Sequence, residues 1–195
     1  MNKHRSLLSY VATLGLLALA MLANGCRNTS AQNREVEKDA RAQQQFNDRM
    51  QAYVSVHRRA AEGTPHIKGS RSGANIVDQQ QKLASRIQAA RDRKEGDIFT
   101  PDVSAYFRRQ IEAAYMANGG GIQASLETAE PGESRKLAVN QPYPHDAPHA
   151  SMPPTILLRL PKLPECMQYE LVNRDLVIRD MESNLVVDLM RNAVP

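Results

Sequence analysis

Hydrophobic residues recur at spacings of three and four in three stretches of this chain. The first stretch covers residues 32–62, the second residues 74–94 and the third residues 101–118. This spacing places apolar side chains on one face of a helix, so the sequence predicts three amphipathic helices. None of them can bury its apolar stripe alone, and we therefore expect them to pack together.

The third predicted helix has the clearest boundaries. Thr100 can accept hydrogen bonds from free backbone amides, and Pro101 suits the first helical position. Asp102 complements the positive end of the helix dipole. Asn118 and the glycines at 119–121 predict the end of this helix.

The C-terminal region carries the pattern of β-structure. Three apolar runs, 167–172, 175–180 and 185–190, are separated by short polar turns, which is typical of an antiparallel meander. Before them, residues 122–155 are rich in proline and glycine and include a predicted proline-rich loop at 140–154. Within that region we expect a short strand at Leu137–Asn140.

A short helix is expected at 153–160, entered at proline. The predicted fold class is therefore α+β: about three amphipathic helices, a short helix and a C-terminal three-stranded antiparallel β meander. Met167, Tyr169 and Leu171 alternate along the first strand and predict a sheet face that the helices cover. We expect a single domain over residues 43–195.

The N-terminus has the three parts of an export signal. Lys3, His4 and Arg5 form a basic start, residues 7–23 carry no charge, and small residues follow. Residues 1–31 are therefore interpreted as an export signal. A retained membrane anchor is the alternative, although seventeen uncharged residues fall short of the about 20 that a span needs.

Two cleavage sites are compatible with this signal. Residues 22–26 resemble the lipobox of bacterial lipoproteins, in which Cys26 becomes the lipid-bearing first residue, although Asn24 departs from the usual small or apolar residue. Cleavage after Ala31 instead follows the small-x-small pattern. The first predicts a periplasmic, membrane-associated lipoprotein, attached at the outer membrane through its lipid, and the second a soluble exported or secreted chain. Residues 32–42 are then a polar tether or a frayed helix start.

Net charge gives no reason to expect a nucleic-acid partner. The full chain has 25 Lys and Arg against 21 Asp and Glu. Residues 1–31 contain Lys3, Arg5 and Arg27 but no acid, so the remainder is close to neutral. A basic excess at 68–94 contains no aromatic residue for base stacking, and a solvated helix face is expected there. An anion-binding surface at 68–94 is the alternative.

The two cysteines do not predict a disulfide. Loss or lipidation of Cys26 leaves Cys166 alone, as either a buried inert residue or a reactive thiol.

One cluster has the residue types of a metal site. His145, Asp146 and His149 offer two imidazoles and a carboxylate, ligands suited to zinc or copper. Pro144 and Pro148 oppose the helix that would align the two histidines. A solvated loop without a metal is expected, and a metal site is the alternative.

Other candidate groups lie on the predicted helices and turns. His57 falls on the apolar stripe of the first helix, which favours an interior histidine with a partner over a general base. The arginine pairs 58–59 and 108–109 would gather and bind an anion if their helices packed side by side. Pairing with nearby acids is the simpler expectation. Asp175, Asp180 and Asp188 flank predicted turns, where turn formation is a commoner role than acid–base catalysis.

Several blocks of residues together resemble a group of uncharacterised exported acidobacterial proteins with no known activity. The matching blocks are Phe46–Arg49, Tyr53–Val54, His57–Arg59, Gly96–Pro101, Phe107–Arg109, Met152–Pro154, Leu163–Pro164, Arg174–Val177 and Asn184–Asp188. The resemblance covers most of the chain after the signal. It implies export and carries over no catalytic residue or cofactor.

The sequence thus favours an exported envelope protein that acts as a non-enzymatic interaction or structural module, as a lipoprotein or in soluble form. Its expected partner is another envelope protein. The first alternative is a small hydrolase or metal-dependent enzyme that uses His145, Asp146 and His149. The second is an anion-binding protein that uses the basic helix at 68–94. No cofactor is expected.

Overall fold

The computed structural model describes the backbone of residues 4–62, 73–92, 94–127, 137–144 and 152–194, with most side chains from Gln32 onward. The chain divides into two units, Met1–Arg41 and Ala42–Pro195. The first unit is helical from His4 and carries exposed i,i+3 and i,i+4 ion pairs at its end. Where side chains are described, no helix is long and apolar enough to cross a membrane. The side chains of residues 7–23, the uncharged segment of the predicted signal, are not among those described.

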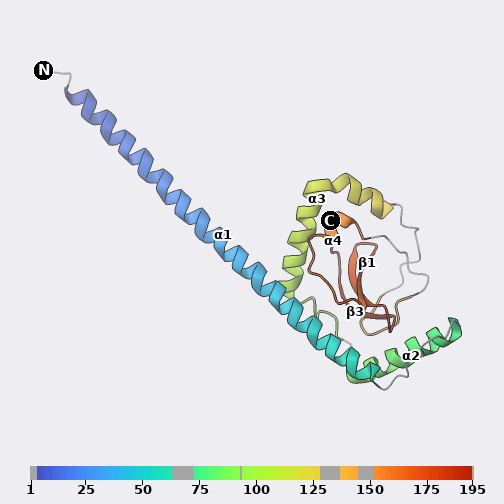
Figure 1. The fold of residues 1–195 in the computed structure, drawn as a ribbon. Coiled ribbons are helices and arrows are strands. Elements are labelled where there is room, and N and C mark those ends of the chain that lie inside the picture. Colours follow the sequence, from blue (N-terminus) through green and yellow to red (C-terminus); the bar gives the residue numbers. More distant parts are fainter. Residues whose placement is uncertain (1–3, 63–72, 93, 128–136, 145–151, 195) are drawn as a thin grey trace. The chain divides into compact units, whose positions relative to one another are not determined.

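The architecture is α+β, as predicted (Figure 1). The helices are α1 (His4–Ala61), α2 (Gly73–Ala90), α3 (Pro101–Glu127) and α4 (Pro154–Leu157). The strands are β1 (Met167–Val172), β2 (Asp175–Asp180) and β3 (Leu185–Met190), which match the three predicted strands.

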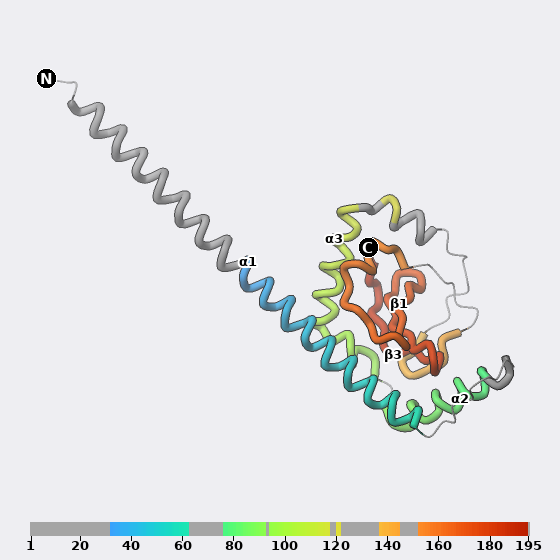
Figure 2. The backbone as a smooth tube through the Cα atoms, in the orientation of Figure 1, coloured from blue at the N-terminus to red at the C-terminus, as the bar shows by residue number. Residues whose placement is uncertain are grey.

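The strands form an antiparallel sheet in the order β1-β2-β3, which Figure 2 traces as a continuous meander. The β1–β2 register runs from Met167 opposite Asp180 to Val172 opposite Asp175. Asn173 begins the first turn and Asn184 ends the second, both with positive φ. Asparagine adopts this conformation more readily than most residues, which explains why the chain turns at these positions.

Both faces of the sheet are covered. Met167, Tyr169 and Leu171 face the main core, as their alternation predicts. This core also contains buried side chains of α1, α2, α3 and α4, namely Phe46, Met50, Ile87, Phe107, Ile111 and Ile156. The opposite face forms a second core, in which strand residues Val172, Val177, Val186 and Leu189 pack against three residues that precede α4, namely Leu137, Val139 and Tyr143.

Three phenylalanines join the helices at the centre of the main core. The ring of Phe107 lies 5.0 Å from that of Phe46 and 5.2 Å from that of Phe99, measured between centroids. Tyr169 on β1 approaches the same ring at 6.1 Å. Phe107 therefore connects α1, the segment before α3, and the sheet.

A bulge in β3 directs two successive side chains toward the helices. The register shifts between Ile178, which pairs with Asp188, and Arg179, which pairs with Val186. Val187 is the extra residue and contributes to the main core. Because a bulge interrupts the alternation of faces, Asp188 also reaches the helix side of the sheet.

The structure corrects two expectations about secondary structure. The third helix does not end at the glycines of 119–121 but continues to Glu127. Glycine weakens a helix by about 1 kcal/mol relative to alanine without forbidding it. Leu137–Asn140 is not a strand, although Leu137 and Val139 are buried against the sheet and Asn140 N–H donates to Val186 O at 2.8 Å.

The remaining boundaries differ by a few residues. The second helix begins at Gly73 and ends at Ala90 rather than Lys94. The first helix includes residues 32–42, and its side-chain ion pairs are consistent with a solvated helical segment. The short helix is four residues long and is entered at Pro154, as expected from proline at its start.

Candidate functional site

The most concentrated group of polar side chains lies where α1 meets the β2–β3 turn. Tyr53 and His57 are four residues apart on α1, so they point to the same side of the helix. Asp180 is the last residue of β2 and is fully buried. Tyr53 Oη donates to Asp180 Oδ2 at 2.8 Å, and His57 Nδ1 contacts the same oxygen at 2.7 Å.

The second carboxylate oxygen of Asp180 shapes the turn. Oδ1 accepts hydrogen bonds from the backbone N–H groups of Glu182 at 3.0 Å and Ser183 at 3.1 Å. This local pattern explains an aspartate at the end of a strand. Both oxygens of Asp180 are thus engaged by protein donors.

His57 lies between two carboxylates. Its Nε2 contacts Glu182 Oε2 at 3.0 Å, on the opposite side of the ring from Asp180. The Glu182 side chain is 61% exposed, whereas that of His57 is only 8% exposed. The hydrogen bond to Asp180 is the main cause that raises the pKa of His57, and burial opposes it. Glu182 raises the pKa further, which favours an imidazolium that donates from both nitrogens.

The same contacts shift the pKa values of the Asp180 carboxylate and the Tyr53 phenol. Burial alone would raise the pKa of Asp180, but the hydrogen bond and charge of His57, together with the hydrogen bonds from Ser183 N–H and Tyr53, hold the pKa below its usual value. Burial and the charge of Asp180 raise the pKa of Tyr53 well above its usual range, so the phenol stays protonated and donates.

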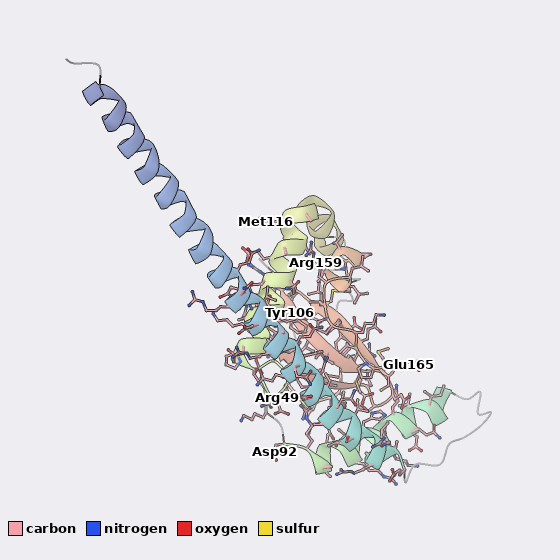
Figure 3. The ribbon with its side chains drawn as sticks, turned by 60° about the vertical axis from the view of Figure 1, so that its left-hand side comes forward. Arg49, Asp92, Tyr106, Met116, Arg159 and Glu165 are labelled. Atoms are coloured by element: carbon pink, nitrogen blue, oxygen red, sulfur yellow. The ribbon has the colours of Figure 1, made fainter. Side chains whose placement is uncertain are left out.

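Arg91, which follows α2, and Asp97, which precedes α3, contact residues of α1 next to this group. The Arg91 guanidinium lies 5.1 Å from the centroid of the Tyr53 ring, and its Nη1 donates to Val187 O at 2.7 Å. Asp97 contacts Arg91 Nη2 at 3.6 Å and accepts from Arg49 Nη1 at 2.9 Å. Arg91 and Arg49, the latter labelled in Figure 3, thus connect the segment before α3 to β3 and to α1.

Asp188 holds the segment before α3 in place. Its carboxylate accepts from the backbone N–H groups of Gly96 at 3.0 Å, Ile98 at 2.7 Å and Phe99 at 2.8 Å. Burial raises the pKa of Asp188, and the backbone donors oppose this effect. Thr100 Oγ1 then accepts from Val103 N–H at 3.4 Å, consistent with the predicted start of α3.

The structure refines the sequence interpretation of the aspartates. Asp180 acts in a turn, and Asp175 accepts from Arg191 Nη1 at 2.8 Å and from the N–H of Asn192 at 2.9 Å. Asp188 is not a turn residue, because the bulge directs it to a segment 90 residues earlier. The interior interpretation of His57 agrees with its burial and its two partners.

The arginine pairs do not share one site. Phe46 packs on Phe107, and Arg58 lies twelve residues further along α1, about 18 Å at the helical rise. Arg108 Nη2 instead donates to Arg191 O at 3.0 Å. Asp97 contacts Arg49 and Arg91.

Of the basic side chains at 68–94, the structure describes those of Lys82, Arg86, Arg91 and Lys94. Lys82 pairs with Asp78 at 2.6 Å on the exposed face of α2. Arg86 Nη1 donates to Ala60 O at 3.2 Å, and Arg91 is directed into the interior. Lys82 and Arg86 thus lie on the exposed helix face that the sequence favoured, whereas Arg91, which follows α2, does not.

Cys166 lies beside the β2–β3 turn, where its carbonyl oxygen accepts from Met181 N–H at 2.8 Å. Burial, followed by the charges of Asp180 and Glu182, raises the pKa of the thiol. The thiolate is the nucleophilic form, so this environment opposes reactivity at neutral pH.

The remaining candidate residues cannot be placed. His145, Asp146 and His149 lie outside the described residues, as do the side chains of Cys26 and Ala31. Among the residues that the structure does describe, no group of three or more His, Cys, Asp or Glu is arranged to hold a metal ion.

Sequence reasoning identified His57 and Asp180 separately and missed Tyr53 and Glu182 as their partners. It also missed the contact of Arg91 with the Tyr53 ring. The available signal was a histidine and a tyrosine one turn apart on an apolar stripe, since buried polar groups require partners. Comparison of the chain with family models, curated proteins and solved structures produced no match.

Proposed function

We propose that this chain is an exported envelope protein whose residues 42–195 act as a non-enzymatic interaction or structural module. The observation that carries the proposal is the engagement of the His57 group. Asp180 is fully buried and bonded at both oxygens, and both ring nitrogens of His57 face carboxylates. A general base needs an unprotonated atom within reach of substrate, and these contacts favour a structural role.

Two features of the sequence support export. Residues 1–31 have the basic, apolar and small-residue parts of a signal. The ordered blocks from Phe46 to Asp188 resemble exported acidobacterial proteins. The anchor we favour is a lipid on Cys26, and soluble export after Ala31 is its alternative.

Lipid labelling in cells tests the proposal. The full chain is expressed in a bacterium that modifies lipoproteins, fed with a clickable fatty acid, and fractionated. We expect label in the envelope fraction, lost in Cys26→Ser and kept in the matched control Cys166→Ser. The intact mass of the mature protein distinguishes a lipid on Cys26 from an N-terminus at Gln32, and either result supports export.

Two outcomes contradict the proposal. One is an uncleaved, unlabelled chain in the cytosol. The other is turnover of a defined substrate that a single substitution, such as His145→Ala or His149→Ala, abolishes in folded protein.

A further inference from the structure

Exposed apolar side chains gather around α4. Leu157 is 49% exposed and Leu158 86%, and Met116 on α3 is 82% exposed. Helices α3 and α4 pack against each other, and Figure 3 shows Met116 and Arg159 at the same end of the second unit. We call Met116, Leu157, Leu158, Arg159 and Lys162 the α4 patch.

The leucines of the α4 patch are held outward by an anchored turn. Ile156 is fully buried in the main core and fixes the turn to the domain. The N–H of Leu157 donates to Pro153 O at 3.0 Å, and that of Leu158 donates to Pro154 O at 2.9 Å. Because these backbone donors are already bonded, the leucines can enter an apolar medium without exposing unpaired amides there.

An apolar groove adjoins the exposed leucines. It has a volume of about 490 Å³ and is bordered by Leu157 and Leu158. Its other apolar walls are Met152, Leu160, Pro161, Leu163, Met167 and Tyr169. This volume lies in the range of sites for small apolar ligands, and it offers room for part of a hydrocarbon chain.

Two cations border the apolar surface. Arg159 and Lys162 are exposed, and neither forms an ion pair with the residues that the structure describes. Glu165, also exposed, is the nearest acid in the sequence, and Figure 3 shows it apart from Arg159 and Met116. Leucine side chains beside exposed cations match the chemistry of an anionic lipid surface, with hydrocarbon below and phosphate above.

We propose that the α4 patch docks on the surface of an anionic lipid bilayer. Leu157 and Leu158 enter the boundary between headgroups and acyl chains, and Met116 lies against it. Arg159 and Lys162 contact lipid phosphates. This inference rests on the proposed function, which brings the protein to a membrane.

Site-specific fluorescence tests the docking. The full chain with Cys26→Ser and Cys166→Ser receives an environment-sensitive fluorophore at Leu158→Cys. It is reconstituted in phosphatidylcholine vesicles with or without phosphatidylglycerol. The matched control carries the fluorophore at Val77→Cys on α2, a position that is 44% exposed.

We expect a blue shift, and quenching by a lipid-attached quencher, only for the fluorophore at position 158 and only with phosphatidylglycerol. Each basic side chain removed should lower the docked-to-free ratio about fivefold. Arg159→Glu with Lys162→Glu should therefore abolish most of the signal.

Three results would overturn the docking. The first is a fluorophore at position 158 that stays as water-exposed as the one at position 77, and the second is docking of equal strength without phosphatidylglycerol. The third is a protein that crosslinks at position 158 in cells, while vesicles leave the fluorescence at that position unchanged. Failure of the proposed function is seen separately, as a cytosolic chain in the fractionation experiment.

Discussion

Replacing His57 by glutamine should reduce stability in a pH-dependent way. Glutamine retains one N–H donor for Asp180 but carries no charge. Removing one partner of a buried ion pair costs about 3 to 5 kcal/mol. Since Glu182 is largely exposed, its contact adds at most about 1 kcal/mol. With one hydrogen bond retained, we expect His57→Gln to lower the free energy of unfolding by about 2 to 3 kcal/mol near pH 5.5.

The pH dependence follows from the directions of the two pKa shifts. The pKa of His57 is raised in the folded state, so its contribution is complete below the unfolded value of 6.5 and is lost as pH rises through the folded value. The pKa of Asp180 is lowered, so its contribution is present above its unfolded value of 3.8 and is lost as pH falls through the folded value. The pair therefore stabilises most between these two unfolded values, and the cost of His57→Gln should shrink in alkaline buffer.

Urea unfolding of the full chain in mild detergent, followed by far-UV circular dichroism, measures this difference. The quantity compared is the free energy of unfolding of the wild type minus that of the variant, at about pH 5.5 and about pH 9. Contributions from the titration of other groups cancel in this difference. Glu182→Gln is the matched control and should cost less than about 1 kcal/mol at either pH. A difference for His57→Gln that is the same at both pH values would refute the role of the imidazolium.

Substitutions at Asp188, Phe107 and Met116 test the packing. Asp188→Ala leaves the N–H groups of Ile98 and Phe99, and those of Gly96 and Leu189, without their acceptor and should cost about 4 kcal/mol, while Asp188→Asn keeps an acceptor oxygen for only one of these two pairs and should cost about 2 kcal/mol in the same urea assay. Equal costs would argue against the carboxylate contacts. Phe107→Ala should cost about 3 to 5 kcal/mol in thermal unfolding, because the ring is fully buried. Met116→Ala, on the exposed face of α3, should change stability by less than about 0.5 kcal/mol, and a comparable loss in both variants would contradict this placement.

The sheet was the most predictable part of the fold. Alternating apolar residues define the strands, and Asn173 and Asn184 adopt the left-handed conformation at their turns. The glycines at 119–121 misled the prediction of the helix end, because glycine lowers helix stability without forbidding the conformation. The strand predicted at Leu137–Asn140 was also wrong, because Leu137 and Val139 are buried against the sheet without forming a strand.

The site was less predictable than the fold. Periodicity indicates that His57 faces inward, yet it cannot identify a partner that lies 123 residues later. The bulge at Val187 has no clear sequence signal, and without it Asp188 would be assigned to the wrong face. Residues joined only by tertiary packing, such as Arg91 and Tyr53, require the structure.

The contacts of Asp180 and Asp188 also bear on the order in which the protein is synthesised. A ribosome completes α1, α2 and α3 before it adds either aspartate, so Tyr53, His57 and the amides before α3 meet their acceptors last. A nascent chain that stops before β2 leaves these donors without their native acceptors. For a chain that is exported, as we propose, the domain can complete these contacts only after β2 and β3 have been synthesised.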